Sequence, residues 1–113
     1  MKPDTAHDII EAIDTHVKND DALERLRRQM FVGAINYARI RTDWFMASIE
    51  ERVEMDSRRR LAHNAFIDAC NVLSRAMHKQ GKPISWRQTL GEDRKQIGDF
   101  ACHLHCVLGI MAR

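Results

Sequence analysis

The sequence contains little that would interrupt a helix. Its 113 residues include only two prolines and five glycines, and β-branched residues are sparse. Proline and glycine are the residues least compatible with a helix interior, and β-branched residues favour strands. With 44% hydrophobic and 30% charged residues, the chain has the composition of a folded protein rather than a disordered one. The composition therefore predicts an all-α protein.

Long apolar runs are also missing. No stretch approaches the roughly 18 apolar residues that a membrane-spanning helix needs, and the first residues, MKPDTAHD, are polar. We therefore expect no secretory signal, no membrane partner and a cytoplasmic location. The three cysteines, Cys70, Cys102 and Cys106, are an odd number within helical patterns, so we expect reduced thiols in the core.

The net charge is only +2, but it is unevenly distributed. Residues 1–24 carry seven acids and two bases, whereas residues 25–60 carry nine arginines and five acids. One interpretation is that an acidic first helix lies against a basic body. A weaker one is that the basic body faces an acidic partner.

Apolar residues recur every three or four positions along most of the chain, which predicts amphipathic helices. We expect helices over residues 5–18, 21–47, 49–55, 57–80, 85–90 and 92–112, with 49–80 forming either one helix or two. We interpret residues 1–113 as one domain, a bundle of about four main helices plus one or two short ones. Within it, the acidic segment 1–20 has few anchoring residues and is expected to be the most mobile part.

The segment 57–80 has an unusual polar side. Its apolar side is predicted to consist of Leu61, Ala65, Phe66, Cys70, Val72, Leu73, Ala76 and Met77. The opposite side carries Asn64, Asp68, Asn71, Arg75 and His78. Asn, Asp and His are poorer helix formers than Lys, Glu and Gln, and they favour fixed hydrogen-bond partners. These five residues are therefore a candidate interaction face; the alternative is that this face is only solvated.

A charged residue lies inside the apolar stripe of segment 21–47. Arg41 is in angular line with Leu23 and Met30, and a charge in such a place is costly unless it is paired. One hypothesis is a buried ion pair with Asp68 or Asp99. The other is that the Arg41 side chain extends past its neighbours into solvent.

Other chemistry has weaker support. The consecutive Arg58, Arg59 and Arg60 could contact phosphates, but the small net charge and the interleaved acids make nucleic-acid binding only an alternative. Cys102 and Cys106 lie one helical turn apart, yet they are weak metal candidates because structural zinc sites need further well-spaced ligands. No glycine-rich phosphate loop, nucleophile elbow or HExxH motif is present. We therefore predict no catalytic residue and no cofactor.

Three phrases, YARIRTDWF, RRRLAHNAFIDACNVLSR and GEDRKQIGDFAC, resemble a family of small uncharacterised bacterial proteins, a domain of unknown function. The resemblance covers residues from about 25 to 113. It implies a compact helical bacterial protein, and it implies no activity, cofactor or site residue.

These patterns favour a non-catalytic helical interaction or self-associating module. Segment 92–112 is apolar around most of its circumference, which one small bundle covers only in part, and segment 57–80 adds an outward row of Asn64, Asn71, Arg75 and His78. Together they predict a homodimer with two-fold symmetry and one of these two faces at its axis. An unidentified protein partner is the other option. The alternative functions are an arginine-rich accessory protein that binds nucleic acid, and a metal-binding or enzymatic helical bundle.

Overall fold

The computed structural model describes the backbone of residues 1–111 and the side chains of residues 1–107. In that part of the chain there are five helices and no strand, so the prediction of an all-α bundle is confirmed. The helices are α1 (Pro3–Val17), α2 (Asp21–Met46), α3 (Ile49–Lys79), the short α4 (Ser85–Leu90) and α5 (Arg94–Met111). The apolar residues Leu108, Ile110 and Met111, which contributed to the prediction of a homodimer, lie outside the described side chains.

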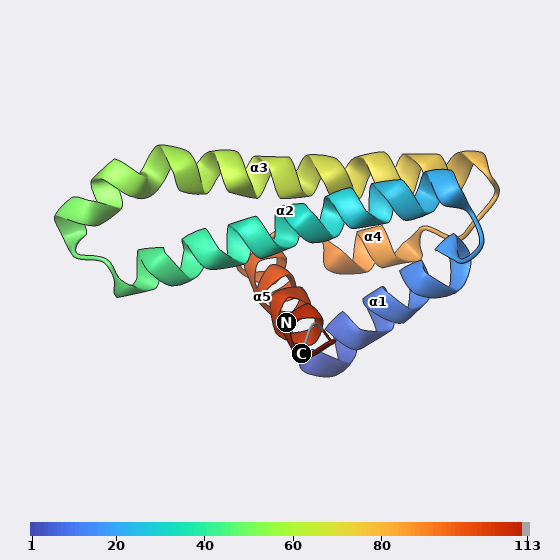
Figure 1. Ribbon diagram of the computed structural model, residues 1–113, viewed down its shortest axis with the longest axis horizontal. Helices are drawn as coiled ribbons and strands as arrows, with labels where there is room; N and C mark the ends of the chain where they lie inside the picture. The colour runs from blue at the N-terminus through green and yellow to red at the C-terminus, as the bar shows by residue number, and fades with distance from the viewer. Residues whose placement is uncertain (112–113) are drawn as a thin grey trace.

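The two longest helices, α2 and α3, form an antiparallel hairpin that runs the length of the molecule (Figure 1). Their connection is very short because Ser48 begins α3 with a capping box. Its hydroxyl accepts the N–H of Glu51, and the Glu51 carboxylate accepts the N–H of Ser48.

The segment 49–80, for which the sequence allowed either one helix or two, is the single uninterrupted helix α3. Asp56 lies at the point where a separate second helix would have begun. Its carboxylate instead pairs with Arg59 and Arg60, three and four residues later. Pairs at this spacing lie on one side of a helix and stabilise it, so the chain continues through this point.

The three remaining helices lie on one side of the hairpin. Helix α5 crosses α2 steeply, and α1 packs against α4 (Figure 1). The end of the hairpin that holds the α2–α3 connection projects beyond these helices. A pair between Arg27 of α2 and Asp14 of α1, 2.6 Å apart, places an acid of the first helix against a base of the second.

The core combines side chains from all five helices. Tyr37 of α2, Phe66 of α3 and Phe100 of α5 form its aromatic centre, with ring centroids 6.3 to 6.5 Å apart along this series. Helix α1 contributes Ile9 and Ile13, which are 2% and 0% exposed. None of the helices in the described part of the chain combines the length and the apolar character needed to cross a membrane.

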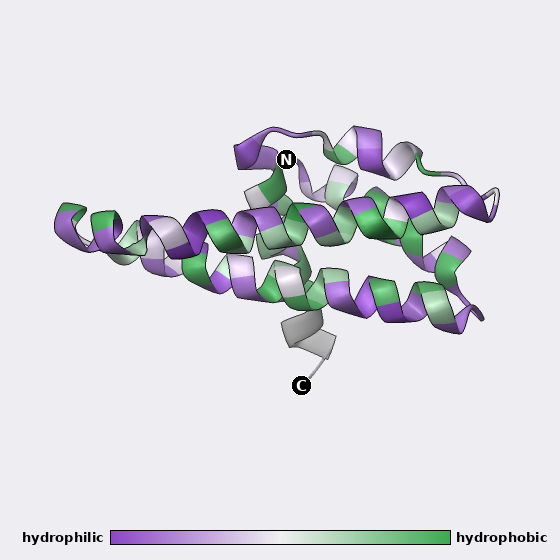
Figure 2. Cartoon of the chain, turned by 90° about the horizontal axis from the view of Figure 1, so that it is seen from above, coloured by the Kyte–Doolittle hydropathy of each residue, from purple (hydrophilic) through white to green (hydrophobic). Residues whose placement is uncertain are grey.

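The buried side of α3 is rotated from the predicted one. Leu61 and Val72 were expected inside, but they are 69% and 38% exposed. The reason is that α3 packs mainly on α2, so closely that a Cβ at Gly33 would lie 3.4 Å from the Cα of Phe66. A helix with one main neighbour buries a narrow stripe, and Figure 2 shows hydrophobic and hydrophilic residues interleaved along both long helices. The predicted residues that are buried are Phe66, Cys70, Leu73 and Met77.

Replacement of Phe66 by alanine should lower the free energy of unfolding by about 3–5 kcal/mol, because it empties the centre of the core. The matched control, Leu61→Ala on the same helix, should cost less than about 1 kcal/mol because Leu61 is largely exposed. Urea denaturation followed by circular dichroism measures both. Equal losses would contradict the observed orientation of α3.

Candidate functional site

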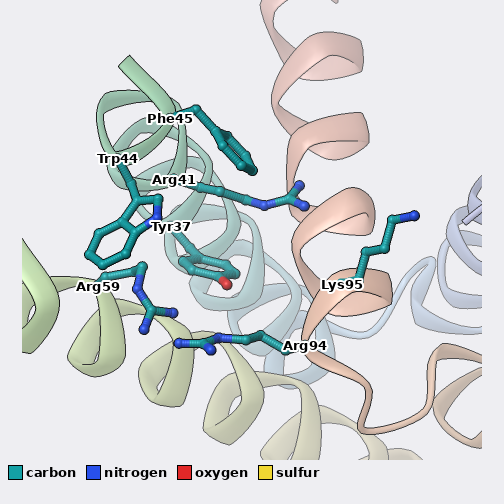
Figure 3. A pocket seen from close by; sticks show the side chains of 7 residues that line it. All are labelled: Tyr37, Arg41, Trp44, Phe45, Arg59, Arg94 and Lys95. Atoms are coloured by element: carbon teal, nitrogen blue, oxygen red, sulfur yellow. The ribbon is translucent and has the colours of Figure 1, made fainter. Parts of the chain in front are cut away.

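A pocket of about 270 Å³ lies where α5 begins beside the projecting part of the hairpin (Figure 3). Four of the side chains that line it are cationic, three are aromatic and none is acidic. They are Tyr37, Arg41, Trp44 and Phe45 of α2, Arg59 of α3, and Arg94 and Lys95 of α5. We call this site the cationic pocket.

Four lining residues share one face of α2. Tyr37 precedes Arg41 by one turn, and Trp44 and Phe45 follow it by three and four residues, so the helical repeat aligns their side chains. The Arg41 guanidinium lies 5.3 Å from the centre of the Phe45 ring, within the range of a cation–π contact. Arg41 therefore interrupts the apolar stripe of α2 at the pocket.

Arg41 also joins α2 to α5. Its Nη1 donates to Oδ1 of Asp99 at 3.1 Å and contacts the Sγ of Cys102 at 3.5 Å. Gly98 makes room for the guanidinium, since a Cβ there would lie 2.7 Å from the Arg41 Nε. Burial acts to lower the pKa of Arg41, but the hydrogen bonds to Cys102 and Asp99 outweigh it and raise that pKa.

The sequence predicted Asp68 or Asp99 as the partner of Arg41, and Asp99 is the one that contacts it. It also accepts a hydrogen bond from the amino group of Met1 at 2.8 Å. This bond and, more weakly, the one from Arg41 outweigh burial and hold the pKa of the Asp99 carboxyl below its usual value. The side chains of Arg41 and Asp99 are 17% and 28% exposed, so the pair is shielded rather than fully buried.

Arg59 approaches the pocket from α3 and is 8% exposed. Its Nη2 donates to Asp56 at 2.9 Å, and its guanidinium lies 4.7 Å from the centre of a Trp44 ring. Its Nε is buried without a hydrogen-bond partner in the described part of the chain. A buried N–H that is not hydrogen-bonded is costly, so the position of Arg59 beside the pocket carries an energetic penalty.

Tyr37 lies between these groups, with its ring edge-on to His63 at 5.3 Å between centroids. Burial raises the pKa of Tyr37, and the positive charges of Arg41 and Arg59 offset this only in part. The hydroxyl is therefore protonated at neutral pH and can donate a hydrogen bond.

Arg94 and Lys95 are on the first turn of α5, and both are exposed. Within the described residues, no carboxylate forms an ion pair with either. Figure 3 shows Arg94 extending toward Arg59 beneath Tyr37, whereas Lys95 points away from these groups. The cationic pocket thus presents several N–H donors to one space, an arrangement that can bind an anion.

Sequence reasoning did not identify Arg94 and Lys95, although a signal was present. The positive end of the helix dipole at a helix N-terminus disfavours cations, and two of them occupy the first turn of α5. Residues placed against a local preference in this way are often functional.

Most of the predicted polar face of α3 is exposed to solvent. Asn64, Asp68, Arg75 and His78 are exposed, and Asp68 does not contact Arg41. Asn71 has a structural role, since its Oδ1 accepts from Nε of Arg87 at 2.8 Å and so holds the segment after α3 against it.

The consecutive arginines point in different directions. Arg59 is buried, Arg60 pairs with Asp56 at 3.0 Å, and Arg58 is exposed, so the three do not form one surface for a nucleic acid.

The cysteines are all free thiols. Burial raises the pKa of Cys70 to about 12, so its thiol stays protonated. Cys102 is half-buried and Cys106 exposed. Within the residues that the structure describes, no three His, Cys, Asp or Glu side chains are grouped to hold a metal ion.

Comparisons with protein-family models, with curated proteins and with solved structures find no match for this chain. Its resemblance to a family of small bacterial proteins therefore stays a prediction, and the geometry of the cationic pocket is the basis for assigning a function.

Asp99→Asn should lower the free energy of unfolding by about 1–2 kcal/mol at pH 7, because Arg41 loses a charged acceptor in a shielded place. The folded-state pKa of Asp99 is below its usual value, so the carboxylate stabilises the protein above the unfolded-state pKa. The difference between the variant and the parent should begin to shrink as the pH falls below about 4, the usual pKa of an aspartate, and it is lost as the pH falls through the lower folded-state pKa.

Urea denaturation at pH 7 and pH 3 measures the difference. Asp43→Asn serves as the control, since Asp43 is exposed on the same helix as Arg41 and has no ion pair within the described residues. A gap between Asp99→Asn and the parent that stays constant with pH would contradict this role of the carboxylate.

Proposed function

We propose that this protein is a non-catalytic helical interaction module that recognises an anionic group of its partner in the cationic pocket. The observation that carries the proposal is the lining itself, four cations and three aromatic rings with no acid among them. Guanidinium groups bind carboxylate and phosphate oxygens through paired N–H donors, and they do so better than ammonium groups in shielded places.

The pocket is preorganised for this role. Asp99 fixes Arg41, Asp56 fixes Arg59, and the rings of Phe45 and Trp44 lie against these guanidinium groups. An arginine that is already ordered loses little side-chain entropy when it binds a ligand. Most of the side-chain entropy that is lost in ordering these donors is therefore lost on folding and not on binding.

A protein partner fits the surroundings of the pocket best. The projecting end of the hairpin carries four apolar side chains that are 62% to 84% exposed, namely Phe45, Met46, Ile49 and Val53. Aromatic residues, methionine and arginine are the residues enriched in protein interfaces. A nucleic acid would instead need a row of outward cations along its backbone, which the divergent Arg58, Arg59 and Arg60 do not supply.

Self-association is a second candidate, favoured by a different surface. Val32 of α2, which is 67% exposed, lines a shallow groove of about 660 Å³ together with Ala65 and Ala69 of α3. Leu61, which is 69% exposed, lies one helical turn before Ala65 on α3, at the side of this groove. A second copy of the chain that buried this outer face of the hairpin would form a homodimer, through a different surface from the two on which the sequence-based prediction rested.

A titration of ¹⁵N-labelled protein with sulfate and with succinate, at constant ionic strength, tests the proposal of anion recognition. We expect saturable amide shifts centred on the residues that line the pocket, which are Tyr37, Arg41, Trp44, Phe45, Arg59, Arg94 and Lys95. Arg94→Gln should weaken binding about ten-fold by removing a charged donor. Arg39→Gln is the matched control, an exposed arginine on the outer face of α2. Shifts that are spread over all arginines and do not saturate would overturn the proposal.

Light scattering behind size exclusion tests self-association. We expect twice the 13.1 kDa mass of the chain at micromolar concentration. Leu61→Glu should restore the mass of one chain, because it places a charge in the proposed contact. Val53→Glu, at the projecting end, should leave the dimer intact. A mass of 13.1 kDa for the parent at every concentration would exclude the dimer.

A further inference from the structure

We infer that the anion bound in the cationic pocket is a phosphate monoester whose organic substituent lies against Phe45. The inference rests on the proposed function and names the chemistry of the ligand. It follows from three features of the pocket: its unmatched charge, the directions of its donors and its exposed aromatic wall.

The charge balance favours a dianion. Asp99 is shared by Arg41 and the amino group of Met1, and Asp56 is shared by Arg59 and Arg60, whereas Arg94 and Lys95 have no carboxylate partner in the described part of the chain. Arg94 at the pocket and Lys95 on its rim therefore contribute two positive charges without a counter-charge. A carboxylate, a sulfate ester or a phosphodiester carries one negative charge, but a phosphate monoester carries about −1.5 to −2 at pH 7.

The directions of the donors favour a tetrahedral group. The Arg59 side chain lines the pocket from α3, the Tyr37 and Arg41 side chains line it from α2, and Arg94 lines it from α5 (Figure 3). Donors from three helices meet one space from different sides. A planar carboxylate offers two oxygens in one plane, whereas a phosphoryl group offers three oxygens that can meet donors from three directions.

The ester substituent has one suitable surface. Phe45 is 62% exposed at the pocket and is next to the Arg41 guanidinium, so an apolar or aromatic group attached to the phosphate can pack on its ring. Trp44 is less available for such packing, because Arg52 and Arg59 lie 5.7 and 4.7 Å from the centres of its rings. A phosphorylated aromatic side chain of a partner protein and a small free phosphate ester both meet this description.

The natural tryptophans offer a local probe. Trp44 lines the pocket, whereas Trp86 is 3% exposed in α4 and its Nε1 has no hydrogen-bond partner within the described residues. Trp86→Phe removes that unpaired donor and leaves Trp44 as the single indole. Fluorescence of this variant then reports on the pocket, and calorimetry on the parent protein checks each affinity independently.

The decisive comparison is phenyl phosphate against phenyl sulfate, which have similar shapes but differ by about one charge at pH 7. We expect phenyl phosphate to bind about ten-fold more tightly, and this preference to shrink as the pH falls below about 6, where the phosphate gains a proton. The double variant Arg94→Gln with Lys95→Gln should remove the preference. Arg25→Gln with Arg39→Gln, which removes two exposed charges of α2, should preserve it.

The outcomes separate the inference from the function on which it rests. Equal binding of both esters overturns the phosphate assignment and leaves anion recognition in place. Absence of binding of either ester, by fluorescence and by calorimetry, overturns both. If the double variant of Arg94 and Lys95 still prefers phenyl phosphate to phenyl sulfate, the binding site lies elsewhere and the inference is also overturned.

Two further ligands distinguish the sources of the phosphate. A phosphotyrosine peptide that binds more tightly than phenyl phosphate supports a phosphorylated protein partner. If adenosine monophosphate binds more tightly than phenyl phosphate, this result supports a small free phosphate ester as the ligand.

Discussion

The crossing of α2 and α5 is the constraint on which the cationic pocket depends. Gly98 of α5 leaves space for the Arg41 guanidinium, and Asp99, the next residue, accepts a hydrogen bond from it. Arg94 precedes Gly98 by one helical turn, so the same face of α5 that accepts Arg41 also carries Arg94 to the pocket. The contact of Arg41 with Gly98 and Asp99, which joins α5 to α2, therefore also brings the positive charge of Arg94 close to that of Arg41.

Each of the two carboxylates that hold the pocket arginines, Asp56 and Asp99, contacts two cationic groups. Asp56 contacts both Arg59 and Arg60, and Asp99 contacts Arg41 and the amino group of Met1. This sharing holds the guanidinium groups in place without cancelling the positive potential of the pocket. Positive groups that surround one space repel one another, and that repulsion weakens when an anion enters. The same arrangement that costs stability in the free protein favours binding.

The sequence predicted the helices well because their signals are local. The capping box at Ser48 and the apolar repeat of α2 depend only on neighbouring residues, and both are observed. The orientation of α3 could not be predicted, because whether Leu61 or Phe66 faces inward depends on the close approach at Gly33 of another helix. The residues of the candidate site also differ in whether a local signal could identify them. Arg41 stood out within its own helix, whereas its choice of Asp99 over Asp68 depended on which helix crosses α2.

The long hairpin explains why the pocket is open rather than closed. Helices α2 and α3 continue past the point where α5 crosses, and no third helix of the described residues 1–111 covers them there (Figure 1). Side chains that would be core residues in a more complete bundle are exposed instead, Phe45 among them. A closed bundle would bury these rings, and burial of four cations beside them would be too costly to tolerate. The projecting end of the hairpin keeps the rings and the cations together at the surface, where one partner that carries both an anion and an apolar group can contact them at once.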